Sequence, residues 1–244
     1  MSYTPHDVEW TPEKVARVWD FYGSIDAFRP LYFSAHSGAA IVDRADREVD
    51  LRGKRVLDFG AGHGDLLAHL FARGIGAKGL EFSSGSAQAT RARFGDEPLF
   101  GGIEIADELP SPYHDGSFDV VFLVEVVEHL LEDQLEPTVR EIERLLAPGG
   151  CVVATAPNGE ELVLEQVRCP DCGATFHRWE HQRSLTPESL AALFGRFEVV
   201  CSEGLHWRAG GLRSRAVRLL GRAGPAPHLL YVGRRPVTTM PFPP

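Results

Sequence analysis

The sequence contains no apolar run of about 18 residues, which excludes a helix that spans a membrane. Its first residues, MSYTPHDVEW, have neither a basic start nor an apolar stretch, so we expect no secretory signal peptide. The four cysteines are too few for a secreted disulfide framework, and a reducing cytoplasm is the expected location. Composition is otherwise ordinary: 244 residues, 43% hydrophobic and 24% charged, indicate a globular chain with a full core.

Lysine is scarce, with Lys14, Lys54 and Lys78 as the only three among 25 basic residues. The net charge of -9 argues against a nucleic-acid partner on electrostatic grounds. The charge is uneven, because residues 201–244 hold seven arginines against one acid. A helical stretch around Leu212–Leu220 within this basic tail could attract an anionic small molecule, or it could be only a solvated helix face. The sequence does not indicate the number of copies in an assembly.

Short apolar runs alternate with helical patterns along the middle of the chain. The expected strands are Lys54–Phe59, Ala77–Glu81, Phe118–Val124, Cys151–Ala156 and His228–Gly233. The expected helices are Gly64–Arg73, Ser86–Phe94 and Glu136–Leu146, the last ended by Pro148-Gly149-Gly150. The pattern predicts an α/β fold: a Rossmann-like sheet of seven mostly parallel strands with helices on both faces.

We expect one domain over 1–244 with four parts. Residues 1–50 are predicted to form a helical cap, and residues 51–156 a core that binds a cofactor. Residues 157–185, rich in cysteine and histidine, are predicted to be an inserted lid. Residues 186–244 then complete the sheet and carry the basic helix.

A glycine loop follows the first expected strand: Asp58-Phe-Gly60-Ala61-Gly62-His-Gly64. Glycines at this position permit a tight turn in which the backbone approaches a ligand at the carboxyl edge of the sheet. The next strand ends in an acid, Glu81, suited to binding ribose hydroxyls. A plain strand-to-helix turn is the alternative interpretation.

Four stretches in this order resemble the class I S-adenosylmethionine-dependent methyltransferases: VLDFGAGHGDLLAHL, GLEFS, LPSPYHDGSFDVVFLVEVVEHL and EIERLLAPGGCVVATAPN. The resemblance covers roughly residues 50–203. It implies that S-adenosylmethionine is the cofactor and that the loop from Asp58 through Gly60, Ala61 and Gly62 lines its methionine part. It also implies that Glu81 binds the ribose and that Phe82 packs on the adenine.

In this family an acid after the third strand often contacts the adenine amine. The stretch Gly102–Asp107 offers two candidates here, Glu104 and Asp107. Glu125, at the end of the following strand, is a further candidate for contact with the cofactor.

Two carboxylates and an imidazole come directly after the strand Phe118–Val124: Glu125, Glu128 and His129. On a helix these positions share one face, and such side chains are ligands for a hard or borderline cation. In the alternative interpretation, the first acid bonds backbone and His129 caps or packs.

The Glu-x-x-Glu-His pattern with a downstream His181 is similar to the metal site of small-RNA 3′-terminal ribose methyltransferases, and to the same stretch of ubiquinone-pathway O-methyltransferases. The resemblance implies that Glu125, Glu128, His129 and His181 hold a divalent cation, Mg²⁺ or Zn²⁺, that engages substrate oxygens. Glu128, His129 and His181 are therefore the candidate catalytic residues.

A competing metal site uses the insert alone. Cys169, Cys172, His177 and His181 form a C-x2-C-x4-H-x3-H pattern, a complete ligand set for structural zinc. His181 cannot easily serve both sites. All four could bind zinc; or His181 could join the glutamates and leave the other three; or the insert could hold no metal and supply a histidine base.

The sequence therefore predicts an S-adenosylmethionine-dependent methyltransferase. The expected reaction is O-methylation of a small-molecule hydroxyl (a sugar, polyol or phenol) assisted by a divalent cation. The alternatives are a metal-free C- or N-methyltransferase, a terminal-ribose RNA methyltransferase, and a non-enzymatic scaffold that binds the cofactor.

Overall fold

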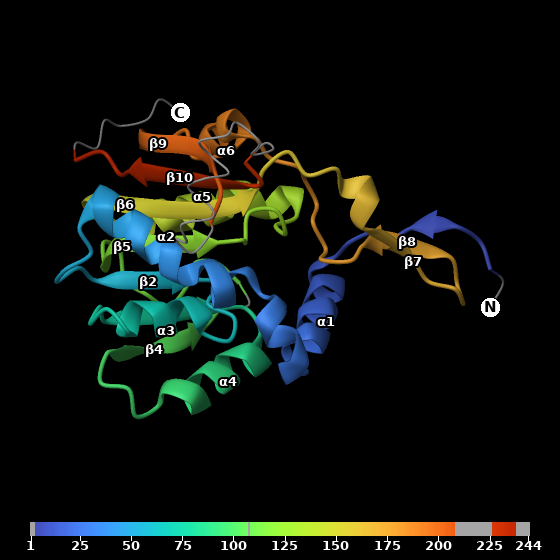
Figure 1. The fold of residues 1–244 in the computed structure, drawn as a ribbon, viewed down its shortest axis with the longest axis horizontal. Coiled ribbons are helices and arrows are strands. Elements are labelled where there is room, and N and C mark those ends of the chain that lie inside the picture. Colours follow the sequence, from blue (N-terminus) through green and yellow to red (C-terminus); the bar gives the residue numbers. More distant parts are fainter. Residues whose placement is uncertain (1–2, 107, 208–225, 238–244) are drawn as a thin grey trace, which may run out of the picture.

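The computed structural model describes residues 3–106, 108–207 and 226–237. Its centre is a seven-stranded sheet in the order β4-β3-β2-β5-β6-β10-β9 (Figure 1). Six of these strands are β2 (Val56–Phe59), β3 (Ala77–Glu81), β4 (Phe100–Ile105), β5 (Phe118–Val124), β6 (Leu146–Pro157) and β9 (Glu198–Leu205). The seventh, β10 (His228–Arg234), runs antiparallel between β6 and β9, whereas β2 to β6 are parallel. The predicted mostly parallel, seven-stranded α/β sheet is confirmed.

Helices cover both faces of the sheet. The helices are α2 (Phe33–Val49), α3 (Asp65–Phe71), α4 (Ser84–Phe94), α5 (Glu132–Leu145) and α6 (Pro187–Leu193). Apolar side chains of α5 and α6 share one buried cluster with one face of the strands, and those of α2, α3 and α4 share a second cluster with the other face. Each helix therefore buries one apolar face against the sheet, as the helical spacing of its apolar residues predicts.

The predicted boundaries around α5 were wrong at both ends. The helix begins at Glu132, where the Gln134 side chain accepts the Leu131 N–H. It ends at Leu145, one residue before the predicted Leu146, because Leu146 is already extended and pairs with Phe118. β4 and β9 were not predicted; Gly101 and Gly102 interrupt the apolar pattern of β4, and β9 begins with exposed residues.

The insert does not fold by itself. Its strands β7 (Gln166–Arg168) and β8 (Ala174–His177) form a hairpin, and β1 (His6–Asp7) from the N-terminal segment adds to β8 in parallel. We call this three-stranded sheet the arm (residues 3–8 and 166–177). The arm projects from the body of the molecule (Figure 1).

The rest of the N-terminal segment is helical, with α1 (Pro12–Gly23) and a 3-10 turn at Asp26–Leu31 before α2. α1 lies at the carboxyl edge of the parallel strands, near the base of the arm. The basic helix predicted around Leu212–Leu220 lies outside the described residues. Within the described residues, no helix is both long and apolar enough to cross a membrane.

Candidate active site

The glycine loop after β2 is held close to the end of β5. Gly60 and Ala61 both donate their N–H groups to the Leu80 carbonyl, at 2.8 and 3.0 Å. Gly60 has a φ of +79°, and a Cβ there would lie 2.7 Å from Val126 Cγ2. Only glycine satisfies both the left-handed backbone and the lack of space. The turn therefore brings bare backbone to the carboxyl edge of the sheet.

Glu81 connects this loop to the one that follows β3. Its carboxylate accepts the Gly62 N–H at 2.7 Å and the Phe82 and Ser83 N–H groups at 2.9 Å each. Burial raises the pKa of Glu81, although these three hydrogen bonds oppose the shift. The neighbouring Phe82 ring is exposed and lies 5.8 Å from the Phe59 ring. The acid and the open ring thus lie together, as a nucleoside-binding edge requires.

Asp58 is buried at the end of β2. Burial, with smaller contributions from the charges of Glu81 and Asp65, raises the pKa of Asp58 to about 8. Buried acids beside a glycine loop favour a ligand that carries positive charge and hydroxyl groups. S-adenosylmethionine has both, so these residues fit the cofactor.

The two candidates for the adenine contact remain predictions. Glu104 is an exposed residue of β4 that pairs with Leu80 of β3. Asp107 lies outside the described residues.

The N-terminal cap packs over the cofactor loops. Asp20 of α1 accepts a hydrogen bond from the Ser83 hydroxyl at 3.0 Å. Gly23 lies so near the same loops that a Cβ would be 3.2 Å from Ser86 Oγ and 3.3 Å from His63 Nε2. α1 therefore touches both loops that the sequence assigns to the cofactor.

Residues 125–129 form an irregular turn and not the expected helix. Glu125 has a φ of +52° and donates its N–H to the Thr155 carbonyl. Glu125, Glu128 and His129 therefore do not share a helix face, contrary to the prediction. The turn nevertheless brings Glu128 and His129 together with His181 from the insert, with one ligand atom of each within 4.8 Å of the others.

Burial leaves this cluster short of hydrogen-bond donors. Neither carboxylate oxygen of Glu128 has a hydrogen-bond partner, nor has Oε1 of Glu125 or Nδ1 of His129. Burial raises the pKa of Glu125 to about 8 and that of Glu128 well above its usual value, and it holds the pKa of His129 well below its usual value. Buried acceptors without donors are costly, and a bound cation is one way to satisfy them. The residues present thus fit a divalent cation.

Glu160 was not predicted as a site residue; it is hydrogen-bonded to His181 and lies against His177, both in the insert. Its Oε2 lies 2.5 Å from His181 Nδ1, and its Oε1 lies 3.4 Å from His177 Nε2. These three residues form a second group of possible metal ligands. Burial opposes ionisation of Glu160, but the two neighbouring histidines outweigh it and lower the pKa of this carboxyl to about 2. Its place just after β6, at the same sheet edge as Glu125, was the available signal.

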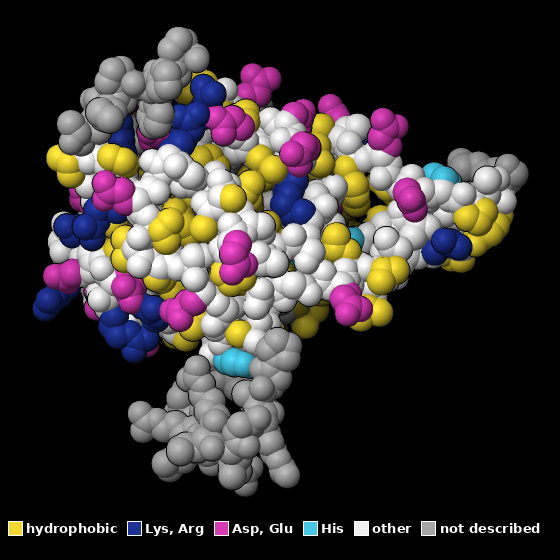
Figure 2. Space-filling view, turned by 90° about the horizontal axis from the view of Figure 1, so that it is seen from above, with side chains coloured by type: hydrophobic (Ala, Val, Ile, Leu, Met, Phe, Trp, Pro, Cys, Tyr) yellow, Lys and Arg dark blue, Asp and Glu magenta, His cyan; other side chains and the backbone are white. Residues whose placement is uncertain are grey.

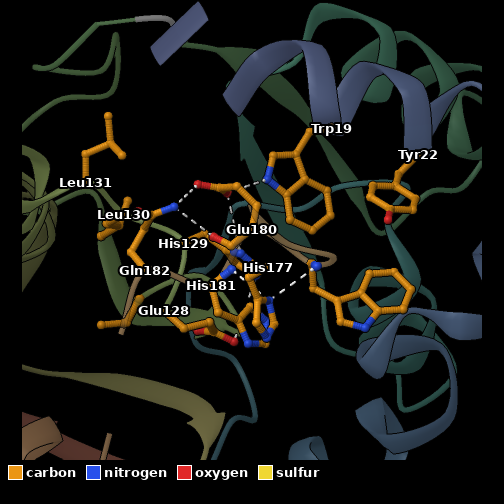
Figure 3. A network of polar contacts seen from close by, with 12 residues as sticks. Trp19, Tyr22, Glu128, His129, Leu130, Leu131, His177, Glu180, His181 and Gln182 are labelled. Carbon is orange, nitrogen blue, oxygen red and sulfur yellow. Dashed lines mark hydrogen bonds and ion pairs between the residues drawn. The ribbon is translucent and has the colours of Figure 1, made fainter. Parts of the chain in front are cut away.

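Glu180 was also missed, and it links the cap to the cluster (Figure 3). It is fully buried, accepts the Trp19 indole N–H at 3.1 Å and the Gln182 amide at 2.8 Å, and lies 3.6 Å from His129 Nδ1. Burial raises the pKa of Glu180 to about 7. The carboxylate therefore contacts groups from α1, the turn and the insert.

The four-ligand zinc set of the insert is not assembled in the structure. Cys169 and Cys172 occupy the turn between β7 and β8, whereas β8 carries the chain away from that turn to His177. Neither cysteine belongs to a ligand group that contains His177 or His181 in the described part of the chain.

Comparisons with known proteins match this chain to methyltransferases. Residues 57–154 match the family model described as "Methyltransferase domain". The chain is 30% identical over 176 residues to norajmaline N-methyltransferase of Rauvolfia serpentina, covering 60% of this chain and 59% of the relative. It is 29% identical over 164 residues to the ubiquinone biosynthesis O-methyltransferase of Aromatoleum aromaticum, covering 65% and 64%. The matched region thus spans about three fifths of the length of these curated relatives.

A solved structure shares the fold over almost the whole chain. It is the 1,6-didemethyltoxoflavin-N1-methyltransferase of Burkholderia thailandensis, crystallised with 1,6-didemethyltoxoflavin and S-adenosylhomocysteine. Its TM-score is 0.65 at 18% identity, and the match covers 96% of this chain and 94% of that chain. Residues 57–154, from β2 to β6, are thus a methyltransferase domain, and the relatives and structural neighbours indicate a class I S-adenosylmethionine-dependent methyltransferase.

Proposed function

We propose that this protein transfers the methyl group of S-adenosylmethionine to a hydroxyl oxygen of a small molecule, with the help of a divalent cation. The observation that carries the proposal is the cluster of buried acceptors without donors at Glu125 and Glu128, beside the cofactor loop. Gly60 of that loop contacts Val126, the residue directly after Glu125. The cluster thus adjoins the place where the methyl donor is expected.

Glu128, His129 and His181 are the residues that would hold the cation. Glu125, the fourth ligand predicted from the sequence, does not join them in a ligand group within the described residues. A bound divalent cation lowers the pKa of a coordinated hydroxyl and fixes it in place. This chemistry suits acceptors with neighbouring hydroxyls, such as catechols, sugars and polyols. The ubiquinone-pathway relative is named as an O-methyltransferase, which supports an oxygen acceptor, whereas the Rauvolfia relative is named as an N-methyltransferase.

Glu160 positions His181, and Glu180 lies beside His129. A carboxylate that accepts a hydrogen bond from the Nδ1–H group of a histidine fixes the tautomer of the imidazole. The lone pair of Nε2 is then free to bind a metal. Glu160 occupies that position next to His181, at 2.5 Å. Glu180 lies 3.6 Å from His129 Nδ1, which is beyond hydrogen-bond distance but close enough to attract a charged imidazole. Both carboxylates come from the insert, so the insert orients ligands instead of serving as a separate zinc domain.

The test uses catechol as the probe acceptor and measures S-adenosylhomocysteine release and the O-methylated product. We expect activity that is lost after exhaustive chelation and restored by Mg²⁺, Mn²⁺ or Zn²⁺. Glu128→Ala should be inactive, whereas Asp133→Ala, a change to an exposed acid in the first turn of α5, should keep activity. Full activity of chelated protein, together with an active Glu128→Ala variant, would overturn the proposal.

A metal-free reaction is the second candidate, favoured by the His181–Glu160 pair. A carboxylate bonded to one imidazole nitrogen raises the basicity of the other, as a general base requires. This candidate predicts activity that is indifferent to chelator and lost in His181→Ala.

A further inference from the structure

Cys169 and Cys172 lie in the turn between β7 and β8, at the far end of the arm (Figure 1). Figure 2 shows the arm standing out from the body of the molecule. Both thiols are free and partly exposed. Neither takes part in the function proposed above, so their arrangement needs its own explanation.

The turn holds the two thiols in a fixed relation. Cys169 donates its N–H to the Ala174 carbonyl at 2.8 Å, and Gly173 donates its N–H to the Cys169 carbonyl at 3.0 Å. Gly173 has a φ of +84°, and a Cβ there would lie 2.5 Å from the Thr4 carbonyl oxygen of the N-terminal segment. The turn is thus constrained by its own backbone and by the chain that crosses it.

The surroundings of Cys169 favour a thiolate. The backbone N–H groups of Cys172 and Asp171 and the Cys172 thiol bond to the Cys169 sulfur, and they lower the pKa of the Cys169 thiol. Backbone N–H groups directed at the first sulfur of a C-x-x-C turn stabilise the charge that a soft divalent metal requires.

A structural zinc site needs four ligands, and this turn supplies two. Within the described residues, no third histidine, cysteine or acid joins the pair at ligand distance. The remaining cysteines, Cys151 and Cys201, belong to β6 and β9 of the central sheet. The sequence of residues 1–2, 208–225 and 238–244 contains neither cysteine nor histidine.

We propose that a second copy of this chain completes the site, so that Cys169 and Cys172 of two arms together bind one Zn²⁺. In a two-fold dimer, the same surface of each copy faces the other copy. The two thiolates of each arm would then lie around one Zn²⁺ and supply its four tetrahedral sulfur ligands. The arm projects from the body of the molecule, which leaves its turn accessible to a second arm. Exposed apolar side chains on and beside the arm, Tyr3, Val163 and Leu164, are available for burial in that contact.

The experiment compares the full-length wild type with Cys169→Ser/Cys172→Ser and with Cys201→Ser as the matched control. Zinc is measured in protein reconstituted under reducing conditions, and mass by light scattering after size exclusion. We expect the wild type and Cys201→Ser to have twice the monomer mass and to hold half a zinc per chain more than the double variant. We expect the double variant to be monomeric with unchanged circular dichroism.

Substituting Co²⁺ for Zn²⁺ should give a thiolate charge-transfer band only where Cys169 and Cys172 are intact. Three results would overturn the proposal: one thiolate-bound metal per monomer, a monomer without such a band, or a dimer that survives in the double variant. Because Glu128→Ala leaves the arm intact, it should keep the thiolate band and the doubled mass. Failure of the active-site proposal and failure of this one are therefore distinguishable.

Discussion

The Oε2 atom of Glu160 lies 2.5 Å from the Nδ1 atom of His181. His181 in turn lies beside Glu128 and His129, so this hydrogen bond connects the insert to the cluster after β5. A charge-assisted hydrogen bond of this kind fixes the imidazole and leaves its other nitrogen for a ligand. Loss of the carboxylate charge should therefore weaken cation binding without removing a ligand of the cluster.

We predict that Glu160→Gln lowers the affinity for Mn²⁺ by about 10- to 100-fold, as is usual when the partner of a ligating histidine is changed. Glu161→Gln alters an exposed neighbour and should leave the affinity unchanged. Calorimetric titration of chelator-treated protein makes the comparison. An unaltered Mn²⁺ affinity in Glu160→Gln would show that this carboxylate does not support the cluster.

The hydrogen bond from the Trp19 indole N–H to Glu180 should contribute to the free energy of unfolding, because it provides a donor to a fully buried carboxylate. Trp19→Phe leaves that carboxylate short of a donor, and we expect a cost of about 1–3 kcal/mol in the free energy of unfolding. In a double-mutant cycle with Glu180→Gln, urea denaturation should give a coupling of at least about 0.5 kcal/mol. Trp10→Phe changes an indole that packs on Phe176 and serves as the control; a Trp19–Glu180 coupling near zero would contradict the assignment.

The buried acids predict that the metal-free protein loses stability as pH rises. Unfolded Glu125 ionises near its ordinary pKa of 4.5, whereas in the folded protein burial raises the pKa of Glu125 to about 8, and the pKa of Glu128 shifts in the same direction. The folded state then binds more protons in this window, so each retained proton lowers the free energy of unfolding by roughly 1.4 kcal/mol per pH unit.

In chelator, the unfolding free energy of the wild type should therefore fall more steeply between pH 6 and 8 than that of Glu128→Gln. Glu161→Gln should keep the slope of the wild type. Equal slopes in wild type and Glu128→Gln, measured by urea denaturation at each pH, would show that Glu128 does not retain a proton.

Gly60 and Gly53 provide a matched pair for the cofactor loop. Both have left-handed φ, +79° and +68°, but a Cβ meets Val126 at Gly60 and nothing within 4 Å at Gly53. We expect Gly53→Ala to cost about 1–2 kcal/mol of stability and to leave cofactor affinity intact. Gly60→Ala should lower the affinity for S-adenosylhomocysteine at least 10-fold by calorimetry. Equal affinities in the two variants would mean that the Gly60 turn does not shape the cofactor site.

The sequence was sufficient for five of the seven strands of the central sheet and for the glycine turn after β2, because apolar runs and glycines act over a few neighbouring residues. β3 and β5 have the predicted bounds, Ala77–Glu81 and Phe118–Val124. The long-range parts were not predictable in this way. The partnership of β1 with β8, and of Trp19 with Glu180, joins residues more than 150 positions apart.

Spacing along the chain also fails to predict which residues meet in space, and this explains why the predicted four-ligand zinc set was wrong. C-x2-C-x4-H-x3-H gives ligand spacing along the chain, but an intervening strand places the cysteines and histidines at different ends of β8. Glu160 and Glu180 were missed because single acids in an irregular segment carry no periodicity.

The most direct test of the cation site is a Mn²⁺ titration of chelator-treated protein by calorimetry, in wild type, Glu128→Ala, His181→Ala and Asp133→Ala. We predict one Mn²⁺ per chain with matching affinity in wild type and Asp133→Ala, and at least a 100-fold loss of affinity in Glu128→Ala and His181→Ala. Equal Mn²⁺ binding by all four proteins, or no binding by the wild type, would contradict the claim that the acids and histidines after β5 hold a cation.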